Sequence, residues 1–107
     1  MNIKPGDTYC QLGQVKRFHI FVFVKEYKGR LLFFDTHTYD LVLITYKAFE
    51  KALKTNAHHP VYPELQMFDF IETLPNDVME VIKAHVEASI KEKEPDILDI
   101  FATCVRN

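Results

Sequence analysis

The most concentrated set of polar side chains in the sequence is the run Asp35-Thr36-His37-Thr38-Tyr39-Asp40. It ends an apolar segment that is typical of a strand. The two-residue period of a strand points Asp35 and His37 to one side and the two threonines to the other. A histidine beside a carboxylate can act as a general base, and threonine hydroxyls can hold a phosphate. The same composition is ordinary in turns, so a purely structural turn is the alternative.

A second candidate group lies upstream, where Arg17 and His19 stand two residues apart at the start of a strongly apolar segment. In a strand this spacing places both on one face. If this segment and the one ending at Asp35 form a hairpin, the start of the first lies beside the end of the second, and the two groups make one cluster. Arginine binds phosphate in a bidentate manner, while histidine or aspartate exchanges protons. Together these groups suffice for metal-free RNA cleavage through the substrate's own 2′-OH, whereas a solvated Arg17 and a buried structural His19 are the alternative.

Other chemistries lack support in the sequence. There is no Walker loop, GxGxxG, HExxH, GxSxG or paired CxxC, so no motif indicates nucleotide binding, zinc hydrolysis or serine-hydrolase chemistry. His58 and His59 are adjacent, point apart in an extended chain and have no third ligand nearby in sequence, so we expect neither a metal nor a cofactor. Cys10 and Cys104 have no disulfide or zinc spacing and are interpreted as free thiols.

The front half of the chain must supply the strands that position these groups. Turn residues stand at Pro5-Gly6-Asp7 and Lys28-Gly29. Between and after them, β-branched and aromatic runs predict five short strands. The predicted strands are Thr8–Leu12, Arg17–Lys25, Arg30–Asp35, Leu41–Ile44 and Leu65–Ile71. The second is apolar on both faces, which indicates a central strand buried on both sides or a barrel strand with a second small core.

Helical spacing dominates the remainder. A short helix is predicted over 46–54, a long one over 75–93 and a final short one over 96–105. The apolar stripe expected for the long helix comprises Val78, Ile82, Val86 and Ile90, with Met79 beside it. These patterns predict an α+β fold: a small curved antiparallel sheet or SH3-like barrel of about five strands with flanking C-terminal helices. It forms one domain over 1–107, strand-rich over 1–74 and helical over 75–107, and an open sheet with helices on one face is the main rival.

The formal net charge of −2 conceals an asymmetry between the two halves. Residues 1–55 carry nine Lys and Arg against five Asp and Glu, whereas residues 56–107 carry four against ten. The basic half suits an acidic partner and the acidic half a basic one, although two halves that attract each other give the same pattern. No apolar run approaches the roughly 20 residues of a membrane span. The first residues also lack the apolar region of a secretory signal, so we expect a cytoplasmic protein.

Three segments carry a resemblance to a known family. They are Lys4-Pro5-Gly6-Asp7-Thr8-Tyr9, then Lys16-Arg17 before Ile20-Phe21-Val22-Phe23-Val24, and the threonine in Phe34-Asp35-Thr36-His37-Thr38. Together, over residues 1–45, they resemble the PemK/MazF-like toxin fold group, which comprises small SH3-like barrels and includes ribosome-independent endoribonucleases. The resemblance implies cleavage roles for Arg17 and for Thr36 or Thr38. The sequence departs from the family pattern because Arg17 precedes Phe18 instead of a proline, and no proline precedes the threonine.

The leading prediction is therefore a PemK-like RNA-binding protein that, if catalytic, is a metal-free endoribonuclease toxin. Arg17 would clamp the phosphate, Thr36 or Thr38 would contact it, and the proton-transfer candidates are His19, Asp35 and His37. Its expected partners are RNA and an antitoxin, and the resemblance suggests a homodimer. The alternative is a non-catalytic protein-interaction module, such as a small bacterial or phage inhibitor or adaptor. That module would use its acidic C-terminal helices to bind a basic protein surface.

Overall fold

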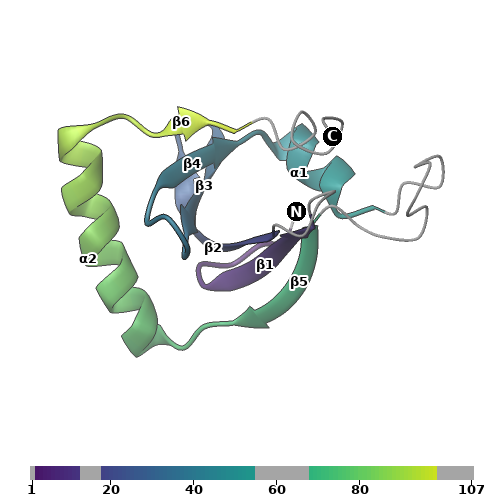
Figure 1. Ribbon diagram of the computed structural model, residues 1–107, viewed down its shortest axis with the longest axis horizontal. Coiled ribbons are helices and arrows are strands. Elements are labelled where there is room, and N and C mark those ends of the chain that lie inside the picture. Colours follow the sequence, from purple (N-terminus) through teal and green to yellow (C-terminus); the bar gives the residue numbers. More distant parts are fainter. Residues whose placement is uncertain (1, 13–17, 55–67, 99–107) are drawn as a thin grey trace.

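The structure is a computed structural model that describes residues 2–12, 18–54 and 68–98. Its elements follow the chain in the order shown in Figure 1. They are β1 (Asp7–Leu12), β2 (Phe18–Tyr27), β3 (Arg30–Asp35), β4 (Leu41–Ile44), α1 (Tyr46–Ala52), β5 (Phe68–Thr73), α2 (Asn76–Glu92) and β6 (Asp96–Ile97). The predicted strands Thr8–Leu12, Arg30–Asp35 and Leu41–Ile44 therefore lie where the sequence indicated, and the helices predicted over 46–54 and 75–93 are present.

All six strands form one sheet in the order β5-β1-β2-β3-β4-β6. Neighbouring strands are antiparallel except for β4 and β6, which run parallel. Figure 1 shows that the sheet curves strongly but remains open, with β5 and β6 at its two edges. The predicted α+β class with a small curved sheet is confirmed. Of its two forms, the structure has the curved sheet and not a closed barrel, because the two edge strands of the described sheet do not pair with each other.

The curved sheet has a core on each face, which explains the two-sided apolar pattern of β2. On the first face, side chains of β1 to β5 and α1 form a core made largely of aromatic rings. Its buried members are Tyr9, Phe21, Phe23, Leu31, Phe33, Ile44, Phe49, Ala52 and Phe68. On the second face, Val22 and Val24 of β2 pack with Met79 and Val86 of α2. The helices therefore cover opposite faces, and the rival layout with both on one face is wrong.

The sharp turn before β1 ties the N-terminal segment to β5. Gly6 has a φ of +98°, and a Cβ there would lie 3.0 Å from the carbonyl oxygen of Leu74, so the position requires glycine. Its N–H donates to the carbonyl of Phe23 at 2.8 Å, and its carbonyl accepts the Leu74 N–H at 2.9 Å. The buried Asp7 carboxylate accepts the Thr73 hydroxyl at 2.7 Å. The Pro-Gly-Asp segment thus has a structural role that its contacts account for.

The end of the chain differs from the prediction. In place of a helix beginning at Asp96, the chain leaves α2 in an extended conformation at Lys93, with φ −153° and ψ 136°. After Pro95 it forms β6, and the Leu98 N–H donates to the carbonyl of Leu43 at 2.8 Å. Proline disfavours helical geometry in the residue before it, and the open edge of β4 offers hydrogen bonds that a short isolated helix lacks. The rest of the predicted helix lies outside the described residues.

Two ion pairs connect α2 and the residues just after it to β2 and to the turn that follows β2. Lys25 Nζ lies 2.8 Å from Glu87 Oε1, and Lys28 Nζ lies 3.0 Å from Glu94 Oε1. These contacts join the basic front half to the acidic back half, so part of the charge asymmetry serves attraction within the chain. The packing face of α2 is centred on Met79 and Val86, and Val78, which the sequence placed in the stripe, is 39% exposed. No helix in the described part of the chain is both long and apolar enough to cross a membrane.

Candidate active site

The cluster predicted from two strands forms in part where β2 begins and β3 ends. The antiparallel register sets Phe21 opposite Asp35. His19, two residues before Phe21 and on the same face, then reaches the carboxylate, and its Nδ1 lies 2.9 Å from Asp35 Oδ2. The imidazole also stacks on the Phe21 ring, with 5.8 Å between centroids and 22° between planes. The hairpin thus brings His19 and Asp35 into contact and fixes the plane of the imidazole.

The Asp35 carboxylate is buried and accepts hydrogen bonds at both oxygens. The residue is 5% exposed. Its Oδ1 accepts the backbone N–H of His37 at 2.8 Å and that of Thr38 at 3.4 Å. Because a carboxylate is an acceptor, His19 donates through Nδ1, and Nε2 is the ring nitrogen left for a reacting group. The side chain of His19 is 39% exposed, so substrate can reach it.

A second imidazole stands beside the first. The ring centroids of His19 and His37 are 6.1 Å apart, with the planes tilted by 47°. The backbone of His37 is held by Asp35, so one carboxylate orients the first ring and positions the residue that carries the second. Two imidazoles at this spacing can reach opposite sides of one small group, which is what a general base and a general acid require.

The two threonines of the cluster shape the turn. Thr36 donates both its hydroxyl and its backbone N–H to the carbonyl of Ile20, each at 3.0 Å. The Thr38 hydroxyl oxygen accepts the Asp40 N–H at 3.2 Å. These bonds match the turn alternative that the sequence left open. The phosphate contact suggested for Thr36 or Thr38 stays a prediction, since no described contact tests it.

Tyr39 lies at the tip of this turn, and the sequence assigned it no role beyond its place in the polar run. It has a φ of +63°, which is uncommon for a residue with a side chain, and its N–H donates to the carbonyl of Asp35 at 2.8 Å. The ring is 66% exposed and stacks on Phe34, with centroids 5.9 Å apart, while His85 of α2 packs edge-on against Phe34 at 5.4 Å. No sequence pattern distinguishes a tyrosine that adopts this backbone conformation, so the turn geometry alone reveals it.

Several predicted positions lie outside the described residues. Among them are Arg17, the proposed phosphate clamp, and the adjacent histidines His58 and His59. The beginning of the predicted strand Leu65–Ile71 and Cys104 lie there as well. Cys10 is a free, partly buried thiol, and burial raises its pKa, with the Asp69 carboxylate adding to the effect. Within the described residues, no three histidine, cysteine or acidic side chains are arranged to hold a metal ion.

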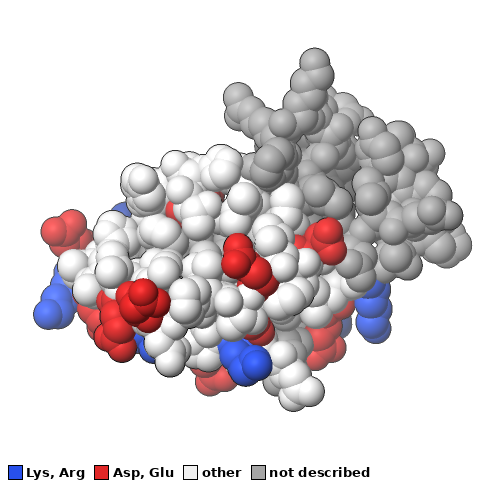
Figure 2. All heavy atoms as spheres, turned by 90° about the horizontal axis from the view of Figure 1, so that it is seen from below, with Lys and Arg blue, Asp and Glu red and all other residues white. Residues whose placement is uncertain are grey.

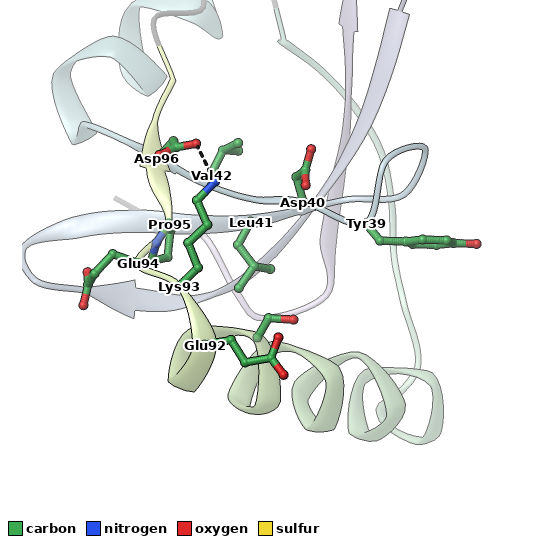
Figure 3. A pocket seen from close by; sticks show the side chains of 10 residues that line it. Tyr39, Asp40, Leu41, Val42, Glu92, Lys93, Glu94, Pro95 and Asp96 are labelled. Atoms are coloured by element: carbon green, nitrogen blue, oxygen red, sulfur yellow. Dashed lines mark ion pairs between the residues drawn. The ribbon is translucent and has the colours of Figure 1, made fainter.

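A separate pocket of about 260 Å³ lies between the β3–β4 turn, β6 and the end of α2 (Figure 3). Glu92, Glu94 and Asp96, acidic residues of the C-terminal segment that the interaction-module alternative would use to bind a basic surface, line it together with Asp40. Figure 3 shows the ion pair between Lys93 and Asp96, whose atoms are 3.6 Å apart. Glu94 and Glu87 are paired with lysines of the front half. Much of the acidic charge on this segment is therefore already satisfied within the chain.

Comparison with known proteins gives no relative. No family model matches the chain, and no curated protein or solved structure matches it either. The resemblance to PemK/MazF-like proteins stays a prediction, and the candidate site is described by its own geometry.

Proposed function

We propose that this protein binds RNA and cleaves it without a metal ion, using His19 and His37 as the proton-transfer pair. Asp35 is the carboxylate that orients the His19 ring and holds the backbone of His37. The observation that carries this proposal is the 2.9 Å contact between His19 Nδ1 and the buried Asp35, with a second imidazole 6.1 Å away. A buried carboxylate that holds one nitrogen of an imidazole fixes its tautomer and supports the positive charge that forms on the ring.

The proposed reaction is an intramolecular displacement at phosphorus. Nε2 of neutral His19 removes the proton from the ribose 2′-OH, and the 2′ oxygen forms a bond to the adjacent phosphorus. The bond from phosphorus to the 5′ oxygen breaks, and protonated His37 donates a proton to that leaving oxygen. The products are a 2′,3′-cyclic phosphate and a 5′-hydroxyl, so atoms and charge balance without a co-reactant. Each proton transfer of this kind typically contributes about 10²- to 10⁴-fold in rate.

The remaining predicted residues would bind the phosphate. Arg17 precedes β2 directly in the sequence, two residues before His19, and a guanidinium there would neutralise the charge that develops on the phosphoryl oxygens. The front half of the chain, with nine basic and five acidic residues, favours approach of a polyanion. An antitoxin partner and a homodimer belong to the same proposal through the family resemblance. The cytoplasmic location expected from the sequence is part of the proposal as well.

The experiment that tests this proposal measures cleavage of a labelled RNA by the purified protein in the presence of EDTA. We expect fragments that end in 2′,3′-cyclic phosphate and no cleavage where a deoxyribose replaces the ribose at the cut site. His19→Gln and His37→Gln should each lower the rate by about 10²-fold or more. His85→Gln is the matched control, because His85 is an exposed histidine of α2 that contacts Phe34 and Tyr39 and lies outside the cluster. Cleavage that needs a metal, or that survives both site substitutions, would contradict the proposal.

A further inference from the structure

The strand β5 forms one edge of the sheet in the part of the chain that the structure describes. It pairs with β1 on one side and stands at the end of the strand order in the described part of the chain. Phe68 is buried in the first core, but every residue from Asp69 to Thr73 is exposed. An edge strand presents unpaired backbone N–H and C=O groups, and such an edge can receive another strand. This row, residues 69–73, is called the β5 edge below.

Two large apolar side chains, from consecutive residues, are exposed on the β5 edge. Phe70 is 51% exposed and Ile71 is 46% exposed. The Phe70 ring lies 5.5 Å from the ring of Tyr9, so it extends the aromatic core of the first face out to solvent. The register shifts between Thr8 and Tyr9, which leaves Ile71 without an opposing residue on β1. Adjacent exposed apolar residues beside unpaired backbone groups are the features of a strand-addition site.

The charge of the β5 edge indicates the chemistry of its partner. Asp69 and Glu72 flank the two apolar residues, and neither forms an ion pair with another described residue. This differs from Glu87 of α2 and from Glu94, which follows α2, because both are paired with lysines. Figure 2 views the molecule from below, with β5 and the lower end of α2 toward the reader. In that view acidic side chains are spread over a largely uncharged face, and the basic ones lie near its margins.

We propose that the β5 edge binds an extended segment of a partner protein in which basic residues alternate with apolar ones. The segment adds as a further strand beside β5, and its backbone pairs with the open N–H and C=O groups. Its apolar side chains cover Phe70 and Ile71, and its lysine or arginine side chains meet Asp69 and Glu72. Complementary charge fixes which segments bind, while backbone pairing supplies most of the affinity.

Charge also favours a basic peptide over two other occupants of the β5 edge, a second copy of this chain and RNA. Antiparallel pairing of β5 with a second copy of itself would bring the carboxylates of Asp69 and Glu72 from both copies onto one short ribbon, and like charges across paired strands are destabilising. RNA phosphates would meet the same two carboxylates and be repelled. The proposal is independent of the histidine cluster, which lies where β2 begins and β3 ends, so RNA cleavage and strand addition can be tested separately.

The test uses the full-length protein and three short fluorescent peptides. The first alternates lysine with valine, the second alternates glutamate with valine, and the third is the lysine peptide with N-methylated backbone amides. We expect the lysine peptide to bind at least about tenfold more tightly than the glutamate peptide, as measured by anisotropy. N-methylation should weaken binding by about tenfold or more, because it removes the donors that pair with β5. Amide shifts in NMR spectra should change along β5 and β1.

Variants separate the β5 edge from general acidity. Glu72→Lys, alone or with Asp69→Lys, should weaken the lysine peptide and strengthen the glutamate peptide. Glu50→Lys is the matched control, because it makes the same charge change at an exposed position on α1 and should weaken the lysine peptide far less. All three positions are exposed, and circular dichroism confirms folding. Absence of binding, equal affinity for the first two peptides, indifference to N-methylation, or a protein dimer that Phe70→Ser dissociates would each overturn the proposal.

Discussion

The contact between His19 and Asp35 predicts a measurable coupling in stability. A hydrogen bond to a charged group contributes about 1.5–3 kcal/mol when buried. The Asp35 side chain is 7% exposed but that of His19 is 39% exposed, so water screens the pair and we expect about 1–2 kcal/mol. Asp35→Ala also removes the acceptor for the His37 and Thr38 N–H groups. Water can reach both of these exposed residues, so this loss adds only about 1 kcal/mol. The total expected for Asp35→Ala is therefore about 2–3 kcal/mol.

A double-mutant cycle isolates the pair from the turn. Urea unfolding is measured for the wild type, His19→Ala, Asp35→Ala and the double variant at pH 7, and the coupling energy should be about 1–2 kcal/mol. Asp40→Ala is the control, because Asp40 is exposed, forms no ion pair with a described residue, and should change the free energy of unfolding by less than about 0.5 kcal/mol. A coupling energy of zero would refute the view that Asp35 holds His19, and the proposed mechanism would lose its orienting group.

Two further perturbations test how the sheet is fastened. Gly6→Ala should lower the free energy of unfolding by about 1 kcal/mol or more beyond the loss caused by Gly29→Ala. Both glycines have a positive φ, but only a Cβ at Gly6 would meet the Leu74 carbonyl. Equal losses in urea unfolding would contradict this prediction. A hydrogen bond from Lys25 lowers the pKa of Glu87, so the ion pair contributes stability at neutral pH that is lost as the pH falls through that lowered pKa. Lowering the pH from neutral to below about 4 should therefore lower the melting temperature of the wild type by more than it lowers that of Glu87→Gln. Identical pH profiles for the two proteins would count against the contact.

The local signals that the sequence carries account for the β2–β3 hairpin. Lys28 and Gly29 have φ values of +50° and +77°, as a two-residue turn with both residues left-handed requires. The turn places Tyr27 opposite Arg30, and regular alternation from there would set Phe21 opposite Thr36. A register shift between Phe23 and Lys25 sets Phe21 opposite Asp35 instead, and this brings His19 to Asp35. Turn chemistry therefore predicts the hairpin, whereas the contact of the central pair also depends on an irregularity in β2 that the sequence did not indicate.

Features that depend on tertiary contacts could not be predicted in the same way. The pattern after Pro95 fits a helix in isolation, but β6 forms because β4 offers an open edge to residues more than fifty positions away. Helix α2 packs on the sheet through Met79 and Val86 and leaves Val78 exposed, and the apolar spacing within the helix does not by itself distinguish these positions. The sequence alone allowed the threonine hydroxyls to contact a phosphate. The structure shows that the Thr36 hydroxyl donates to the carbonyl of Ile20.

The most direct test of the central claim is the RNA cleavage rate of wild-type protein against His19→Gln, in EDTA, with the end group of the product identified. The proposed function predicts metal-independent cleavage, a 2′,3′-cyclic phosphate end and a loss of about 10²-fold or more in the variant. Intact RNA with a folded wild-type protein, or equal rates for the two proteins, would contradict it, and the His19–Asp35 pair would then be a structural feature of the β2–β3 hairpin.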